Sequence, residues 1–213
     1  MIQVRVWDWP TRLFHWTLAG LIIALVITGN VGGNAMVWHF RCGYGVLSLL
    51  IFRIIWGFCG GHWSLWRHLA FTPALVWQYL RPSAPRTNFL GHNPLGSLSI
   101  LAMLALLGLQ VSTGLFSDDE IANSGPLARF VAESTVSLAT RWHKGYGKTL
   151  VLLLVAIHLL AILWYLVKKK ENLTRAMLTG NKTAEAPAPS SNDGPVNWLL
   201  AVLCLLISGG LVF

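Results

Sequence analysis

Two histidines, His143 and His158, lie in the most hydrophobic stretch of the sequence, where their imidazole rings could bind a metal. Fifteen residues of α-helix advance by about 22 Å and turn by about 60° beyond four full turns. Both rings could therefore face the same side of a helix bundle, one near each membrane surface. Ionisable residues at membrane depth are costly, and they usually face a bundle interior and serve a function. Imidazole is also the usual protein ligand of haem iron.

The composition is that of a membrane protein. Of 213 residues, 54% are hydrophobic and 11% are charged, and the mean hydropathy is +0.58. The net charge is +8, but the basic residues lie in separate loops, so we predict no nucleic-acid partner. The three cysteines form no CxxC or CxxCH motif, which excludes covalently attached c-type haem. We expect no cleavable signal peptide, because the first apolar segment lacks a small-residue cleavage site.

Five apolar segments predict an all-α membrane protein, with a four-helix transmembrane bundle and a fifth, C-terminal hydrophobic helix. These segments are residues 13–31, 39–58, 94–116, 143–167 and 196–213. A polar Pro- and Ser-rich linker divides the chain into a membrane domain (1–182), the linker (183–195) and a C-terminal transmembrane helix (196–213). The last segment has no histidine, so we expect it at the edge of the bundle. The Trp-rich connection, residues 63–80, predicts an interfacial helix divided by Pro73.

The basic residues predict the orientation of the chain. They gather at the N-terminus and after the second and fourth segments, whereas the connection after the third segment is acidic. Cytoplasmic loops carry an excess of Lys and Arg, so we predict a cytoplasmic N-terminus and a periplasmic C-terminus. The basic residues concerned are Arg5, Arg12, Arg53, Arg67, Arg81, Arg86, Lys168, Lys169, Lys170, Arg175 and Lys182.

This orientation places four histidines at two levels of the membrane. His15 and His158 lie near the cytoplasmic side, and His39 and His143 lie near the outer side. Two b-type haems, each with two histidine ligands, would satisfy the arrangement. Each histidine could instead be an interfacial anchor or a satisfied polar residue, and the coincidence of level is what favours paired ligands. A haem-free channel or transporter is the remaining alternative, and it leaves the intramembrane His158 unexplained.

Four cations flank these histidines: Arg12, Arg41, Arg141 and Lys144. They could pair with haem propionates, since arginine forks suit carboxylates, or they could be ordinary charges at the membrane edge. Both interpretations stay open. His92, in GHNPLG before the third segment, could line a quinone pocket together with the Trp-rich connection, or it could cap a loop.

Several motifs together resemble the bacterial cytochrome b561 family. They are VWDWPTRLFHW in the first segment, WHFRCGYGVLSLLIFRIIWGF in the second, GHNPLG before the third and H-x14-H in the fourth. The resemblance covers about residues 4–182, and the family includes the b-type cytochrome subunits of nickel hydrogenases and is related to those of formate dehydrogenases. It implies a four-helix core in the bacterial inner membrane with two b haems. The inner haem would be bound by His15 and His158, and the outer haem by His39 and His143.

The resemblance implies a di-haem cytochrome that transfers electrons between membrane quinone and a periplasmic partner such as a c-type cytochrome. Haems with two protein ligands have no open iron position and suit one-electron transfer, so we assign no catalytic residue. The acidic outer loop with Asp118, Asp119 and Glu120 could dock a basic partner.

Two further functions stay open. One is a self-contained superoxide:quinone oxidoreductase, for which a positive outer surface would attract the anion. Its cations would be Arg41, Arg141, Lys144 and Lys148. The other is a haem-bearing membrane anchor subunit of a periplasmic dehydrogenase. We also leave open whether the chain forms a homodimer.

Overall fold

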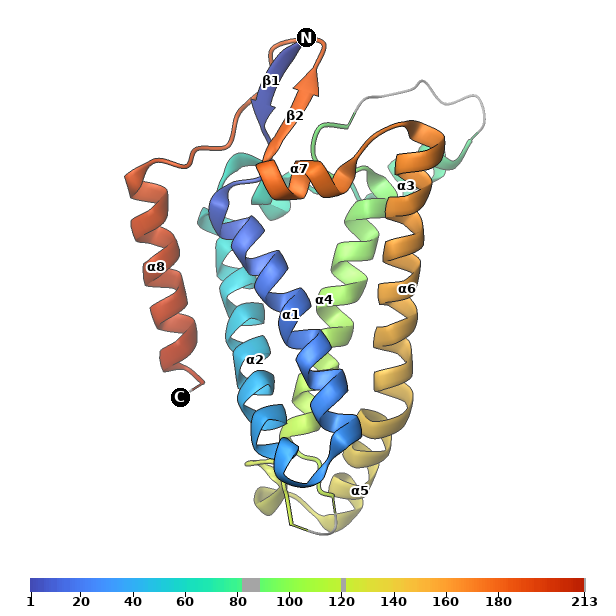
Figure 1. Ribbon diagram of the computed structural model, residues 1–213, viewed down its shortest axis with the longest axis vertical. Coiled ribbons are helices and arrows are strands. Elements are labelled where there is room, and N and C mark those ends of the chain that lie inside the picture. Colours follow the sequence, from blue (N-terminus) through green and yellow to red (C-terminus); the bar gives the residue numbers. More distant parts are fainter. Residues whose placement is uncertain (82–88, 120–121, 213) are drawn as a thin grey trace.

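Four long apolar helices dominate the computed structural model, which describes residues 1–81, 89–119 and 122–212 (Figure 1). Three of them are α1 (Trp9–Val31), α2 (Met36–Cys59) and α4 (Pro94–Leu115). The fourth is composite, because α5 (Glu133–Arg141), the π-helical turn η5 (Trp142–Gly147), α6 (Lys148–Trp164) and a second π-helical turn, η6 (Tyr165–Lys169), follow one another without a break. Each of the four is long and apolar enough to cross a membrane. The predicted multi-pass helical membrane protein is confirmed.

The local sequence explains where the helices begin. The Asp8 carboxylate accepts a hydrogen bond from the Thr11 amide at 2.8 Å and caps α1. The Asn93 side chain caps α4 in the same way, accepting from the Gly96 amide at 2.8 Å. A proline lies in the first turn of each helix, where its missing amide proton costs nothing.

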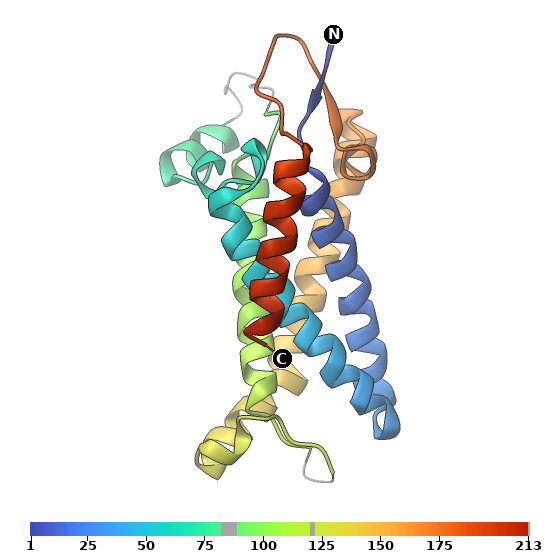
Figure 2. The same cartoon turned by 90° about the vertical axis from the view of Figure 1, so that its left-hand side faces the viewer.

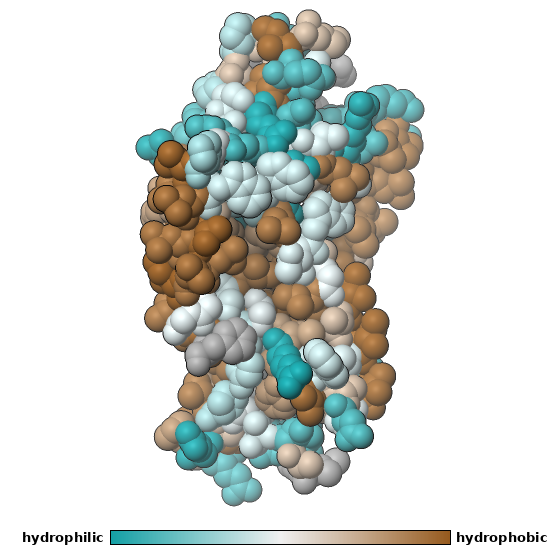
Figure 3. All heavy atoms as spheres, turned by 60° about the vertical axis from the view of Figure 1, so that its left-hand side comes forward, coloured by the Kyte–Doolittle hydropathy of each residue, from teal (hydrophilic) through white to brown (hydrophobic). Residues whose placement is uncertain are grey.

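The helices alternate in direction, with α1 and α4 running one way and α2 and α6 the other (Figure 1). Buried side chains of α2, α4 and α6 form a central cluster, against which partly buried leucines and an isoleucine of α1 pack. The buried members are Val46, Leu50, Leu107 and Val151. Apolar side chains also cover much of the outward surface between more hydrophilic ends (Figure 3). Such an apolar surface is suited to contact with the hydrocarbon core of a membrane.

Short elements cover the end of the bundle that carries the N-terminus, called the inner end below; the opposite end is the outer end (Figure 1). The Trp-rich connection forms turns η2 (His62–Ser64) and η3 (Trp66–His68), then helix α3 (Pro73–Leu80). Pro73 therefore begins a helix and does not divide one, as its fixed φ favours. Helix α7 (Leu173–Thr179) lies at the same end. At the outer end, η1 (Gly33–Ala35) precedes α2 and η4 (Ala128–Phe130) precedes α5.

A small antiparallel ribbon ties the start of the chain to the segment after α7. Strand β1 (Ile2–Arg5) pairs with β2 (Asn181–Ala184). The predicted linker continues along the N-terminus: the Ser191 amide donates to the Arg5 carbonyl at 2.7 Å, and its hydroxyl donates to the Val6 carbonyl at 2.8 Å. The ribbon could not be expected from the sequence, because strands of four residues are too short to show a clear alternation.

The C-terminal helix α8 (Pro195–Gly210) packs against α2 at the edge of the bundle. Its buried Ala201 and Cys204 join an apolar cluster with Trp56, and the Cys204 sulfur lies 3.8 Å from that of Cys59. Sixteen residues rise by about 24 Å, and α8 runs from the inner end to a point part-way along the bundle (Figures 1 and 2). Its crossing of the membrane and the periplasmic C-terminus stay predictions, and Phe213 lies outside the described residues.

Candidate functional site

The four histidines predicted as ligands meet as two pairs. The ring centroids of His15 on α1 and His158 on α6 are 6.4 Å apart, and those of His39 on α2 and His143 in η5 are 6.0 Å apart. The first pair lies towards the inner end and the second at the outer end, with Val151 of the central cluster between them along α6. The structure thus brings the rings together in the combinations expected from depth. Iron ligation by these rings stays a prediction.

The spacing within each pair suits one metal between two rings. A metal–imidazole bond is about 2 Å long, so two imidazoles that bind one metal from opposite sides have centroids about 6 Å apart. Both observed separations match this value. In the described parts of the chain, no three His, Cys, Asp or Glu side chains gather as ligands for a bare ion. Two protein ligands per site would suit a six-coordinate haem iron, because the porphyrin supplies the other four.

Backbone carbonyl groups orient both rings of the outer pair. The Nδ1 of His143 lies 2.8 Å from the Gln110 carbonyl oxygen, and that of His39 lies 3.1 Å from the Leu25 carbonyl oxygen. The His39 Nδ1 is also 3.3 Å from the Thr28 hydroxyl. An Nδ1–H that donates to a carbonyl leaves the Nε2 lone pair for a metal, which is the usual arrangement of metal-binding histidines.

Two glycines let the outer rings lie directly against neighbouring helices. A Cβ atom at Gly29 of α1 would lie 3.0 Å from the His39 Cε1, and one at Gly114 of α4 would lie 2.8 Å from the His143 Cε1. A side chain at either position would displace the ring. Sequence reasoning missed both glycines, because spacing along one helix identifies neighbours only on that helix.

The π-helical turn η5 carries His143 and changes the expected geometry. Its hydrogen bonds span five residues, so the rotation of about 60° predicted for an α-helix does not describe His143 and His158. Gln110 of α4 stabilises this turn by donating from its side-chain nitrogen to the His143 carbonyl oxygen at 2.9 Å. A glutamine within an otherwise apolar segment was the sequence signal for this contact, because polar residues at membrane depth need partners.

Among the described residues, no such backbone contact is found for the inner pair. The Nδ1 of His15 is buried without a hydrogen-bond partner among the described residues. Nearby, the fully buried Asp8 accepts hydrogen bonds from the Gly61 amide at 3.0 Å and the Ser64 hydroxyl at 2.9 Å, in addition to its cap of α1. Sequence reasoning missed Asp8 as a structural residue, although it stands directly before the predicted first helix.

Arg53 of α2 is also buried at the inner end, with 4% of its surface exposed. Its guanidinium carbon lies 4.3 Å from the ring centroid of Trp66, a cation–π contact. The Trp66 indole N–H donates to the Ile54 carbonyl oxygen at 3.1 Å. Gly57 leaves room for the indole ring of Trp66, because a Cβ at this position would lie 1.9 Å from the indole nitrogen.

The four cations predicted to flank the histidines differ in their surroundings. Arg12 is buried, and its Nε donates to the Met177 carbonyl oxygen of α7 at 3.2 Å. Arg41, Arg141 and Lys144 are exposed at the outer end. Their pairing with haem carboxylates stays a prediction.

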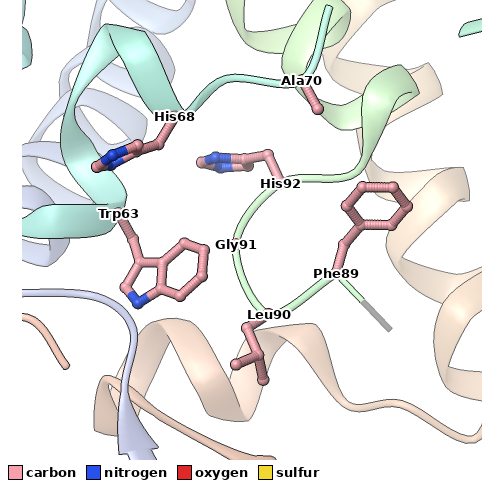
Figure 4. Close-up of a pocket in the computed structure, with 7 residues that line it drawn as sticks. All are labelled: Trp63, His68, Ala70, Phe89, Leu90, Gly91 and His92. Atoms are coloured by element: carbon pink, nitrogen blue, oxygen red, sulfur yellow. The ribbon is translucent and has the colours of Figure 1, made fainter. Parts of the chain in front are cut away.

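A pocket of about 290 Å³ lies at the inner end between the Trp-rich connection and the GHNPLG loop (Figure 4). The ring of His92 lies 4.5 Å from that of Trp7 between centroids, and its Nδ1 is buried without a hydrogen-bond partner in the described chain. Burial, together with the charges of Arg53 and Lys182, lowers the pKa of His92 to about 3, so the ring is neutral near pH 7. The lining residues are Trp63, His68, Ala70, Phe89, Leu90, Gly91 and His92.

Comparison with known proteins identifies the family of the chain. The sequence model of the prokaryotic cytochrome b561 family matches residues 6–180. A relative from Rhodobacter capsulatus, named as a probable Ni/Fe-hydrogenase B-type cytochrome subunit, is 24% identical over 220 residues, which cover 85% of this chain and 82% of the relative. The relative of the same name from Azotobacter chroococcum is 27% identical over 132 residues, 48% of this chain and only 54% of the relative.

A relative from Escherichia coli K12, named as a probable Ni/Fe-hydrogenase 1 B-type cytochrome subunit, is 25% identical over 146 residues, which cover 54% of this chain and 60% of the relative. No solved structure matches the chain significantly. The family match covers all four long helices completely. The chain therefore belongs to the prokaryotic cytochrome b561 family, whose b-type haem gives its members an electron-transfer role in the membrane.

Proposed function

We propose that the chain binds two b-type haems, one between each histidine pair, and carries electrons along the bundle. The observation that supports this most is the presence of two facing imidazole pairs, 6.4 Å and 6.0 Å between ring centroids, at two levels of one bundle. Haem held by two histidines would supply one-electron chemistry and would leave no iron position open to a substrate. The protein orients the outer rings through the Leu25 and Gln110 carbonyls and keeps the two levels apart with its central cluster.

Electrons would pass between membrane quinone at the inner end and a redox partner, such as a c-type cytochrome, at the outer end. The pocket beside His92 supports a quinone site there, because it combines apolar walls with the polar rings of His68 and His92. A neutral imidazole can donate to a quinone carbonyl or accept from a quinol hydroxyl. The basic inner end favours a cytoplasmic N-terminus in the bacterial inner membrane.

The outer partner is the less constrained part of this proposal. Asp118 and Asp119 belong to the outer loop, where Asp119 accepts a hydrogen bond from the Asn123 side chain at 2.7 Å. Glu120, the third acidic residue predicted for docking, lies outside the described residues. A basic partner surface would complement this loop.

Quinol oxidation by the purified protein tests the proposal. Mixed anaerobically with a short-chain quinol in detergent, the protein should show reduced b-haem absorbance, and oxidised c-type cytochrome should then reoxidise it. The variant His92→Leu should slow reduction by quinol at least tenfold without changing full reduction by dithionite. Thr113→Val, in an apolar pocket at the outer end, is the matched control. Equal quinol rates in both variants would argue against a quinone site in this pocket. Superoxide added to the oxidised protein with quinone, in the absence of c-type cytochrome, tests the oxidoreductase alternative.

The names of the relatives favour a second candidate, a cytochrome subunit attached to a membrane-bound enzyme. A hydrogenase partner makes a specific prediction: hydrogen gas should reduce the b haem in native membranes, and deletion of the hydrogenase should abolish that reduction. If quinol reduces the haem while hydrogen does not, the result favours electron transfer from quinone over attachment to a hydrogenase.

A further inference from the structure

Arg53 lies on the face of α2 that looks into the bundle, at the level of the inner histidine pair. It follows His39 by fourteen residues, which advance by about 21 Å and end about 40° short of four full turns. Val46 and Leu50, on the same face, are buried against α4 and α6. Helix α2 therefore carries a histidine at the outer level and an arginine at the inner level of one interior face.

The Arg53 guanidinium is buried without an anion beside it. The ion pairs found in the described chain join Arg5 to Asp193 and Lys182 to Glu171, and neither involves Arg53. Its Nη1 is buried and has no hydrogen-bond partner in the same residues. An isolated charge in an apolar interior is very costly, so buried cations are found with anions.

Asp8 does not supply that anion. Its charge attracts Arg53, but no Arg53 nitrogen lies within ion-pair distance of it. Both Asp8 oxygens already accept hydrogen bonds, one from Thr11 and the other from Gly61 and Ser64. The Nη1 of Arg53 is thus left for a ligand.

We propose that Arg53 anchors a propionate carboxylate of the haem held between His15 and His158. This inference rests on the proposed function, because it requires an inner haem. A planar guanidinium with paired donors binds a carboxylate better than other cations do, and the Trp66 ring holds it in place. Arg53, and not Arg12, is then the inner anchor, because the Arg12 Nε already donates to the Met177 carbonyl of α7, whereas the Arg53 Nη1 has no partner in the described chain.

The contact has a measurable electrical consequence. Reduction adds one negative charge to the haem, and a cation at its edge favours the more negative form. Arg53 should therefore raise the midpoint potential of the inner haem. The outer haem, about 20 Å further along α2, should feel the charge much less.

A redox titration of purified, haem-loaded protein tests this anchor. Arg53→Gln and Arg53→Met remove the charge, and the apolar methionine avoids burying an unpaired amide. We expect the equilibrium constant for reduction of the inner haem to fall at least tenfold, 59 mV for a one-electron couple. Loss of the inner haem alone would support the anchor equally. Arg53→Lys should restore most of the potential, and the outer haem should stay constant throughout.

Arg81→Gln is the matched control, because Arg81 is an exposed inner-end arginine whose guanidinium also lies over a tryptophan, 5.8 Å from the Trp77 ring. It should shift the inner potential far less than Arg53→Gln. An unchanged inner potential in both neutral Arg53 variants, or an equal shift in Arg81→Gln, would overturn the anchor. A wild-type protein without an inner haem would overturn the proposed function instead.

Variants that fail to assemble are also informative. If both neutral variants lose both haems, the Arg53→Lys variant decides whether Arg53 anchors the haem. A lysine variant with two haems and an inner equilibrium constant within tenfold of wild type supports the anchor. A lysine variant that also loses both haems overturns it, because the arginine then serves the fold and not a carboxylate.

Discussion

The outer and inner histidine pairs are built in different ways. In the outer pair, backbone carbonyls of α1 and α4 orient His39 and His143, and Gly29 and Gly114 make room for the rings. In the inner pair, the Nδ1 of His15 has no partner in the described chain, and Asp8 and Arg53 are buried at the same end of the bundle. The backbone therefore orients both outer rings, whereas the described backbone does not orient His15; buried polar atoms without a partner occur at both ends, among them the Gln110 Oε1 at the outer end and the Arg53 Nη1 at the inner end.

Removal of one histidine from each pair should give the largest effects. His143→Ala should lose the outer haem and keep the inner one, and His158→Ala should do the reverse, because each haem loses one of its two axial ligands. The haem content of each purified variant, with its low-temperature absorbance spectrum, measures this. His62→Ala, in turn η2 at the inner end, should keep both haems. Unchanged haem content in either ligand variant would remove that histidine from the proposed set.

Filling the space beside an outer ring tests whether the backbone preorganises that pair. Gly114→Val should displace His143 and weaken the outer haem by about 1–3 kcal/mol, the usual cost of overpacking, while sparing the inner haem. Gly108→Val on the same helix is the control, because a Cβ there meets nothing within 4 Å. Haem titration of the apoprotein gives both affinities. Equal losses from both substitutions would mean that a general helix effect, and not contact with the ring, is responsible.

The buried Asp8 network should matter to the inner end alone. Asp8→Asn places an amide where the Gly61 and Ser64 donors point, and we expect a loss of about 1–3 kcal/mol in unfolding free energy, typical of a buried group left unsatisfied. Thermal unfolding in detergent, followed through the absorbance of each haem, should show earlier release of the inner one. Glu171→Gln, which breaks a partly exposed ion pair, should cost less. Earlier release of the outer haem would contradict this assignment.

The smallest effect expected is a pH dependence from His92. Its folded-state pKa of about 3 lies below the ordinary value of 6.5, so between these pH values the unfolded chain binds the extra proton. The stability that neutral His92 contributes is complete above pH 6.5 and falls as the pH drops towards 3. From pH 7 to 5.5 we expect a loss of at most about 1.4 kcal/mol, which His92→Phe should remove. The same pH dependence in that variant would assign the loss to other groups.

The long helices and the levels of the histidines could be predicted from the sequence. A long apolar run in lipid must satisfy its backbone internally, which makes it a helix, and a fixed rise per residue then gives the depth of His15, His39, His143 and His158. The depth of each histidine depends on its own helix alone and not on how the helices pack.

Contacts between helices could not be predicted in the same way. Gly29 and Gly114 matter because of rings on other helices, and Arg53 resembled an ordinary membrane-edge charge until its burial against Trp66 was known. The π-helical turn at His143 depends on Gln110 of α4, so no spacing within the fourth segment reveals it. Tertiary packing determines these features, and one sequence carries little local signal for it.

The haem b content per polypeptide tests the central claim most directly. We would measure it by the pyridine haemochromogen method on detergent-purified, folded protein expressed with haem available. The account predicts a value near two, one haem for each histidine pair. A value near one would contradict the equivalence of the two pairs as binding sites, and a value near zero would contradict the electron-transfer function as a whole.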